Sequence, residues 1–238
     1  FLLQVAIALA SGTPVAKGIF PAYPTPCRVV YLAAEESAEL LQLRLHAIAK
    51  AMMDSGRQKA LALDEHVVAL WEKNLSIVPG VGTVTRLIKD GEREDFFHEL
   101  CDFCQGARLV IVDPLRRLHD GDENDSAAMT AIVETLEAIA VKTGAAIITA
   151  HHVGKAALLH GMNELAGASR GSTALTDAVR WQLNVSGMSE SDAQKYGMTS
   201  DRKAYVRLDY AKANYLPPQK TLWMRRTHGG VLEHVHIP

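Results

Sequence analysis

The feature that most constrains the fold is an apolar stretch ending on an acid, R-L-V-I-V-D-P-L-R-R at residues 108–117. Leu109 to Val112 form an unbroken apolar run, which is typical of a strand buried on both faces, as in a parallel sheet covered by helices. Asp113 then lies at the carboxyl end of the strand, where open α/β sheets bind their ligands. A carboxylate there suits Mg²⁺, although a buried strand followed by an Asp-Pro turn gives the same pattern.

Two further strands of the buried type also end in polar residues. The strand C-R-V-V-Y-L-A precedes Glu35, and the strand A-A-I-I-T-A precedes His151 and His152. If the strands are parallel, these groups converge with Asp113 on one edge of the sheet. A carboxylate can orient a water, an acid can hold Mg²⁺ and an imidazole can contact a γ-phosphate, so together they favour a nucleotide hydrolase. Taken singly, Glu35 is more often a helix-start acid and His151 a partly buried structural histidine.

Strands and helices alternate up to residue 150, and strands dominate after it. Helices are expected at residues 1–10, 38–53, 60–71, 93–106, 127–143 and 171–180. Strands are expected at residues 27–33, 75–78, 109–112, 145–150, 181–185, 205–210, 222–226 and 231–235, and the last two are expected to form a hairpin around Gly229-Gly230. This order predicts an α/β fold with a mainly parallel sheet, flanked by helices and extended by antiparallel strands near the C-terminus. We expect residues 1–238 to form a single domain.

Composition narrows the class of protein. The formal net charge of −2 over 238 residues argues against a chain coated in positive charge, so any nucleic-acid contact has to come from local loops or from assembly. No apolar run approaches the ~20 residues of a membrane span, so no membrane contact is expected. Three cysteines without a disulfide framework predict a cytoplasmic protein. Cys101 and Cys104 form a lone C-x-x-C, for which a core position is favoured over zinc binding.

Five stretches in order resemble the RepA-type plasmid replicative helicases, which belong to the RecA/DnaB group of P-loop ATPases. They are A-A-E-E-S after V-V-Y-L, L-V-I-V-D-P-L-R-R-L-H, T-A-H-H-V-G-K, A-S-R-G-S-T-A-L-T-D-A-V-R-W and Y-A-K-A-N-Y. The resemblance covers residues 1–231 and implies a RecA-like P-loop NTPase core. It also implies a hexameric ring that hydrolyses ATP with Mg²⁺ and moves along single-stranded DNA during replication.

The resemblance implies catalytic roles for the residues at the strand ends. Glu35 matches the catalytic glutamate that activates water. Asp113 matches the Walker B aspartate, which holds Mg²⁺ beside the nucleotide. His151 and His152 match the γ-phosphate sensor that communicates with the DNA loops.

A second group of residues matches positions that act between subunits or on DNA. Lys212 matches the lysine of the K-x-N motif, which reaches the nucleotide of a neighbouring subunit, and Arg180 is a candidate trans-acting arginine. Lys155 and Arg170 flank the segment that matches a DNA-facing loop, although a plain flexible connection has the same composition. Trp181 and Trp223 offer faces for base stacking, but a tryptophan on a strand is more often in the core.

The phosphate-binding string of the family, G-x-x-x-x-G-K-[ST], occurs nowhere in these residues. In the family it directly precedes a helix like the one expected at residues 1–10, so the chain is expected to begin just past it. Without the backbone amides and the lysine of that loop, we expect this chain alone to bind ATP poorly.

Two alternatives to the helicase interpretation stay open. One is a RecA-like ATPase that acts in recombination or regulation without unwinding DNA. The other is a non-catalytic module that kept the fold, lost the phosphate-binding loop and binds DNA or a protein partner.

Overall fold

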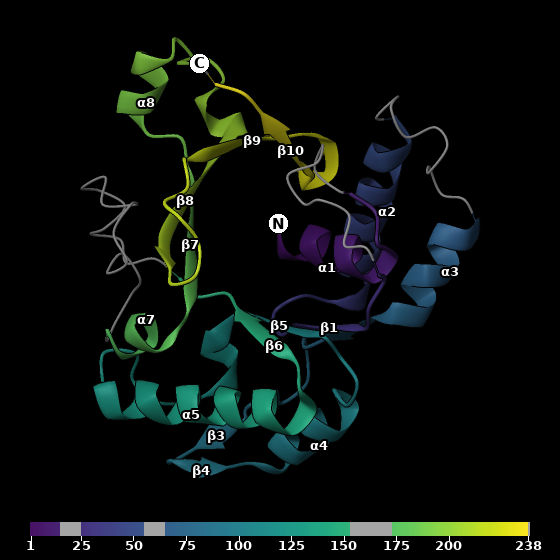
Figure 1. The fold of residues 1–238 in the computed structure, drawn as a ribbon, viewed down its shortest axis with the longest axis vertical. Coiled ribbons are helices and arrows are strands. Elements are labelled where there is room, and N and C mark those ends of the chain that lie inside the picture. Colours follow the sequence, from purple (N-terminus) through teal and green to yellow (C-terminus); the bar gives the residue numbers. More distant parts are fainter. Residues whose placement is uncertain (15–24, 55–64, 153–172, 238) are drawn as a thin grey trace.

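The computed structural model describes residues 1–14, 25–54, 65–152 and 173–237, shown in Figure 1. The helices in these ranges are α1 (Leu2–Ser11), α2 (Ala38–Asp54), α3 (Glu65–Asn74), α4 (Asp95–Phe103), α5 (Ser126–Thr143), α7 (Ala174–Ala178) and α8 (Glu190–Lys195), with 3-10 turns η2 (Leu115–Leu118), η5 (Arg202–Ala204) and η6 (His228–Gly230). The strands are β1 (Val29–Ala33), β2 (Leu75–Pro79), β3 (Ile88–Lys89), β4 (Glu92–Arg93), β5 (Leu109–Asp113), β6 (Ala146–Thr149), β7 (Trp181–Gly187), β8 (Tyr205–Ala213), β9 (Leu222–Arg226) and β10 (Leu232–Val235).

A four-stranded parallel sheet forms the first half of the fold, in the order β2-β1-β5-β6. In its register Ala33 lies opposite Asp113, and Val112 lies opposite Thr149. The three strands that were expected to carry polar residues are therefore adjacent, and they end at the same edge. The parallel arrangement predicted from the sequence is confirmed.

Both faces of this sheet are buried, which explains why its strands are apolar without alternation. Tyr31 and Ile111 point into a cluster shared with α1 and α2. Leu32 and Val112 point to the opposite face, into a cluster shared with α4 and α5. Figure 1 shows the same layers, with α1 on one side of the sheet and α4 and α5 on the other.

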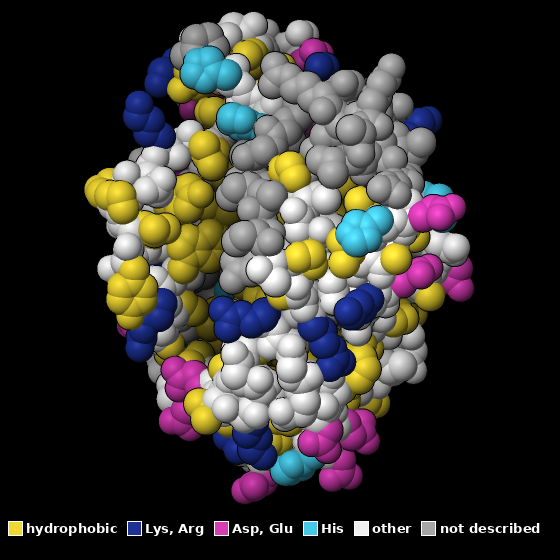
Figure 2. Space-filling model, turned by 45° about the vertical axis from the view of Figure 1, so that its right-hand side comes forward, with side chains coloured by type: hydrophobic (Ala, Val, Ile, Leu, Met, Phe, Trp, Pro, Cys, Tyr) yellow, Lys and Arg dark blue, Asp and Glu magenta, His cyan; other side chains and the backbone are white. Residues whose placement is uncertain are grey.

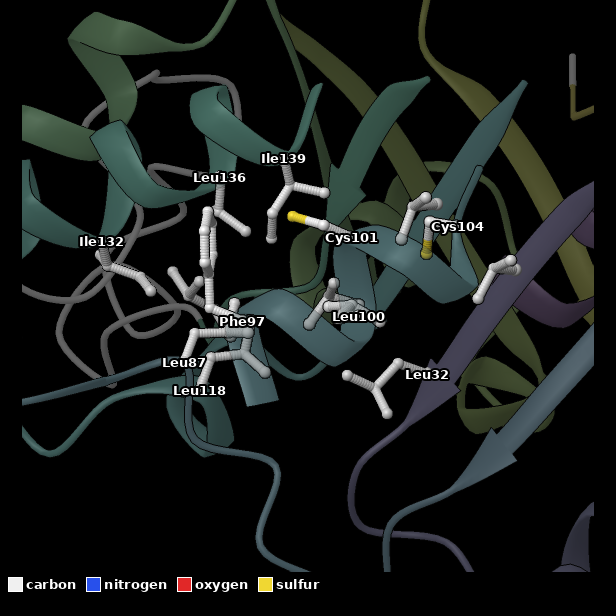
Figure 3. Packing of buried hydrophobic residues seen from close by; sticks show 14 of the residues in the cluster. Leu32, Leu87, Phe97, Leu100, Cys101, Cys104, Leu118, Ile132, Leu136 and Ile139 are labelled. Carbon is white, nitrogen blue, oxygen red and sulfur yellow. The ribbon is translucent and has the colours of Figure 1, made fainter. Parts of the chain in front are cut away.

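The C-x-x-C pair lies in the second of these clusters, as expected. Cys101 and Cys104 are free thiols, both buried, and Figure 3 shows Cys101 beside Ile139. Burial raises the pKa of the Cys104 thiol to about 11. Within the described ranges, no group of three or more His, Cys, Asp or Glu side chains could hold a metal ion.

A four-stranded antiparallel sheet, in the order β10-β9-β8-β7, forms the C-terminal part and includes the predicted hairpin. Its residues Leu208 and Met224 share the cluster of α1, which joins the two sheets. The buried Gln4 of α1 completes the junction, because its side-chain amide donates to the carbonyl of Leu232 at 2.9 Å and accepts from the amide of Leu232 at 3.0 Å. These bonds satisfy the edge strand β10, where backbone groups would otherwise lack partners.

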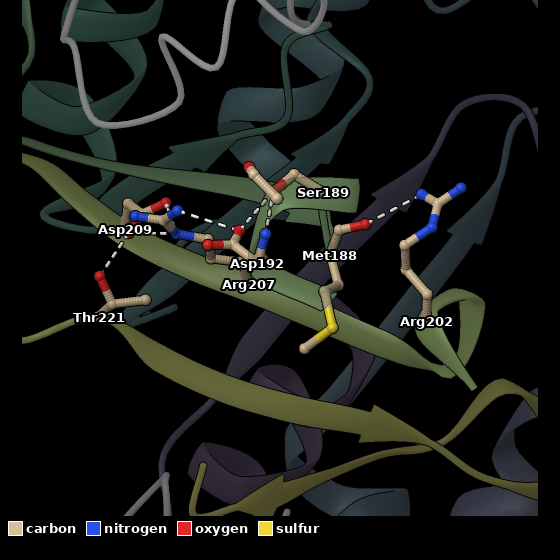
Figure 4. A network of polar contacts seen from close by, with 8 residues as sticks. Met188, Ser189, Asp192, Arg202, Arg207, Asp209 and Thr221 are labelled. Atoms are coloured by element: carbon tan, nitrogen blue, oxygen red, sulfur yellow. Dashed lines mark hydrogen bonds and ion pairs between the residues drawn. The ribbon is translucent and has the colours of Figure 1, made fainter. Parts of the chain in front are cut away.

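A polar network stabilises the antiparallel sheet (Figure 4). Arg207 lies 3.3 Å from Asp192 and 2.9 Å from Asp209, and Thr221 donates to Asp209 at 2.7 Å. Asp192 belongs to α8, a helix that was not expected from the sequence. Ser189 caps that helix by accepting from the backbone N–H of Asp192 at 3.0 Å.

Several local expectations need correction. The helix expected from Arg93 begins at Asp95, because β3 and β4 form a short hairpin immediately before it. The helix expected at residues 127–143 begins one residue earlier, at Ser126, and its N-cap is Asp125, whose carboxylate accepts from the amide of Ala127 at 2.8 Å. The helix expected at residues 171–180 is shorter, because α7 spans Ala174–Ala178.

The two tryptophans differ in environment. Trp223 is 7% exposed and belongs to the core, as predicted. Trp181 is 40% exposed and packs edge-on against Tyr210, so the core interpretation is wrong for it. In the described part of the chain, no helix has both the length and the apolar character that crossing a membrane requires.

Candidate functional site

Four of the residues that the sequence singled out, Glu35, Asp113, His151 and His152, follow β1, β5 and β6 at the edge where these strands end. Hydrogen bonds continue past the strands, since the amide of Ala34 donates to the carbonyl of Asp113 at 2.8 Å and that of Ala150 to the carbonyl of Val112 at 2.9 Å. Glu35 and His151 each follow directly on one of these bonded residues. Backbone pairing therefore brings Glu35, Asp113 and His151 to one edge of the sheet.

Asp113 is half-buried and held from the neighbouring strand. The hydroxyl of Tyr31, on β1, donates to its Oδ2 at 2.7 Å. Burial and the charge of Asp113 raise the pKa of Tyr31, so the phenol keeps its proton and remains a donor. This bond engages Oδ2, and the second oxygen of a carboxylate can bind a cation. One carboxylate that acts together with substrate phosphates is the usual protein contribution to a Mg²⁺ site, so Asp113 fits this ion.

The two acids after β1 have different environments. Glu35 is exposed at the rim, where its carboxylate is available to a water molecule. Glu36 forms an ion pair with Arg44 of α2, and its Oε2 is buried without a hydrogen bond from the described residues. Arg44 was not predicted as part of this region, because an ion pair across the start of a helix leaves no pattern in the sequence.

A small recess lies beside the first turn of α1. Its lining includes Gln4, Arg44 and the turn formed by Gly229 and Gly230. The turn packs directly on α2, because a Cβ on Gly229 would lie 2.3 Å from the Cβ of Ala47. The C-terminal hairpin, predicted only as a local unit, therefore borders the same region as α1 and α2.

The end of β6 carries a histidine that faces a buried carboxylate. Nδ1 of His151 lies 3.9 Å from Oε1 of Glu123, and their side chains are 8% and 9% exposed. His119 lies in the same cluster, where burial and the Arg116 guanidinium lower its pKa. His152, in contrast, is exposed. His119 and Glu123 were not predicted as site residues, because they lie between a strand and a helix and belong to no motif in the sequence.

The two residues expected to act between subunits lie at one end of the antiparallel sheet. Lys212 donates to the carbonyls of Thr176 and Asp177, both at 2.9 Å, at the end of α7. Arg180 donates to the carbonyl of Ala178 at 2.9 Å. Both cations thus bind the same helix end within this chain, which is favourable because carbonyls there carry partial negative charge.

Lys155 and Arg170, the two residues expected to contact DNA, lie outside the described residues.

Comparison with known proteins supports the fold and the family. Residues 1–157 match the family model AAA_25, an AAA domain. Among solved structures, the chain is similar to a DnaB-like replicative helicase, with a TM-score of 0.62, 14% identity, and coverage of 88% of this chain and 51% of that one. It is also similar to the RadB recombinase, with a TM-score of 0.50, 14% identity, and coverage of 88% and 80%.

The chain spans about half the length of the helicase chain, and at this identity the likeness shows the fold alone. The fold is α/β and RecA-like, with a parallel sheet between helices and antiparallel strands at the C-terminal end. Because the family model covers residues 1–157 of 238, the chain belongs to the AAA_25 (AAA domain) family of P-loop ATPases.

Proposed function

We propose that this chain is the ATPase core of a DNA helicase of the RepA/DnaB type, which couples ATP hydrolysis to movement on single-stranded DNA in replication. The observation that carries the proposal is the common edge of β1, β5 and β6, where Glu35, Asp113 and His151 follow three adjacent parallel strands. The family and the RecA-like fold support ATP as the nucleotide.

Each residue at this edge has a chemical role in the proposal. Glu35 accepts a proton from a water molecule and orients that water for attack on the γ-phosphate. Asp113, oriented by Tyr31, would hold Mg²⁺, which would supply positive charge beside the phosphates. His151 and the exposed His152 contact the γ-phosphate and respond to its loss.

Residues from a second subunit complete the site in this proposal. Lys212 and Arg180 share one end of the antiparallel sheet, which gives a neighbouring subunit a pair of cations for its phosphates. Exposed apolar side chains nearby, among them Trp181 and Val185, suit contact with another copy of the chain. Figure 2 shows one face on which hydrophobic side chains border a hollow, with basic side chains below it. We therefore expect a homo-oligomeric ring, a hexamer, whose separate subunits have little activity.

The test uses the complete gene product, including any residues ahead of Phe1, and measures ATPase activity with single-stranded DNA. Glu35→Gln should lower kcat by about 10²- to 10⁴-fold, because it removes a general base. Glu72→Gln, at an exposed position on α3, is the matched control and should leave kcat unchanged.

A strand-displacement assay on the same protein distinguishes the alternatives. Displacement that depends on ATP supports the helicase. ATPase activity without displacement favours a RecA-like ATPase of recombination or regulation, for which the likeness to RadB is the supporting observation. If the wild-type protein hydrolyses no ATP with DNA present, the chain is a binding module.

A further inference from the structure

A buried carboxylate lies behind the ring of His151. Glu123 precedes α5, and its Oε1 is 3.9 Å from Nδ1 of His151, with both side chains less than a tenth exposed. Within the described part of the chain, this oxygen accepts no hydrogen bond. Moving a carboxylate out of water is costly unless its charge is paired. The burial of Glu123 against an imidazole therefore suggests that the two groups interact.

The loop that carries Glu123 is held in place by several contacts. Arg116 donates to the carbonyls of His119 at 3.4 Å and Gly121 at 3.0 Å, which closes the loop. The carboxylate of Asp122 accepts from a backbone N–H two residues further on, at 2.9 Å. A Cβ on Gly121 would lie 2.7 Å from a side chain of α5, so the backbone packs directly on that helix. These contacts hold the backbone on either side of Glu123 in place.

Among the described residues, the titratable side chains near this carboxylate include Arg116, His119 and His151. Burial and the nearby Arg116 lower the pKa of His119, so this ring is neutral at pH 7. The guanidinium of Arg116 is engaged with the carbonyls of the loop. His151, whose ring nitrogen faces Oε1, is then the group best placed to donate a proton to Glu123.

We propose that Glu123 is a positioning residue for His151: its carboxylate accepts the Nδ1–H of that ring, so that Nε2 is the nitrogen presented to the nucleotide. The hydrogen bond that one ring nitrogen makes decides which nitrogen carries the proton. The distance of 3.9 Å exceeds a hydrogen bond by about 1 Å, and contacts of this kind tighten when substrate binds. The inference rests on the proposed function, because it assigns a partner to the γ-phosphate sensor.

Nuclear magnetic resonance of protein labelled with ¹⁵N-histidine tests the contact directly. In the wild type, the neutral ring of His151 should carry its proton on Nδ1. Glu123→Gln should return it to the Nε2–H form that free imidazole prefers, whereas Glu134→Gln, at an exposed position on α5, should behave as the wild type. The proposal is overturned if His151 has the same tautomer with and without the Glu123 carboxylate. If Glu123→Gln does not fold, Glu123→Asp provides the comparison, and a mixture of tautomers is expected.

ATPase kinetics of the complete gene product provide the second measurement. Glu123→Gln should lower kcat by about 10- to 100-fold, the usual effect of losing a carboxylate behind a functional histidine, with little change in KM for ATP. An unchanged kcat would contradict the positioning role. If the wild type hydrolyses no ATP, the proposed function fails, while the tautomer of His151 still decides whether Glu123 positions the ring.

Discussion

The hydroxyl of Tyr31 donates a hydrogen bond of 2.7 Å to Oδ2 of Asp113, from one parallel strand to the next. Tyr31 is 1% exposed, so the bond lies largely away from water, where it has fewer competitors. The bond engages Oδ2 of Asp113 and thereby fixes the direction in which Oδ1 points. The edge residue that we propose for Mg²⁺ is therefore oriented by a core residue.

Replacing Tyr31 by Phe should destabilise the protein by about 1.5–3 kcal/mol, the usual contribution of a hydrogen bond to a charged group. The carboxylate also loses its orientation, so half-saturation by Mg²⁺ in the ATPase assay should require a higher concentration. Chemical denaturation and Mg²⁺ titration measure the two effects. Tyr215→Phe, at a position 84% exposed, is the control. Equal stability of the two variants would contradict the role assigned to the bond.

The buried His119 should make the protein less stable in mild acid. Its pKa in the folded state is lowered by burial and by Arg116, so below about pH 6.5 the unfolded chain binds more protons than the folded one. The free energy of unfolding should therefore fall as the pH decreases below this value, by at most about 1.4 kcal/mol per pH unit from this group.

Denaturation at several pH values checks this dependence. His119→Gln should show a flatter profile than the wild type, whereas His228→Gln, at an exposed position, should keep the wild-type slope. Identical slopes in all three proteins would show that His119 does not contribute.

The three thiols should differ in reactivity. Burial raises the pKa of each thiol, to about 11 for Cys104, and only Cys27 is partly exposed. At pH 8, a thiol reagent should modify Cys27 first, and Cys101 and Cys104 only after unfolding. Cys27→Ser should remove the fast phase. Rapid modification of all three thiols in the folded protein would contradict the core assignment.

This chain alone should bind ATP weakly, because its sequence contains no G-x-x-x-x-G-K-[ST] string to surround the phosphates. Isothermal titration of the 238-residue chain with ATP and Mg²⁺ measures the affinity. A dissociation constant in the micromolar range would show that other residues replace the loop.

Replacing Lys155 and Arg170 together by Ala should weaken binding to single-stranded DNA and reduce its dependence on salt, because fewer counterions are released. Fluorescence anisotropy at several salt concentrations measures both the affinity for single-stranded DNA and its dependence on salt. The control replaces Lys73 and Lys89 by Ala and so removes the same amount of positive charge. Both residues are exposed and lie far in the sequence from residues 155–170. If the two double variants bind equally well, residues 155–170 do not contact DNA.

The parallel sheet was predictable from residues that are close together in the sequence. A strand buried on both faces has to be apolar at every position, so the runs at Val29–Ala33 and Leu109–Asp113 identified β1 and β5 and indicated which residues follow them. The glycine pair at the C-terminal hairpin was equally informative, because Gly229 and Gly230 both have positive φ.

Contacts between elements could not be predicted in the same way. The sequence determined most of the strands and helices and the polar residues at the strand ends, because backbone geometry and burial act on neighbouring positions. Only the tertiary structure decided that Tyr31 meets Asp113 across 82 positions, that Gln4 meets Leu232 across 228, and that Glu123 faces His151. Such pairs depend on strand order and helix packing, which are properties of the whole chain and leave no periodic pattern in the sequence.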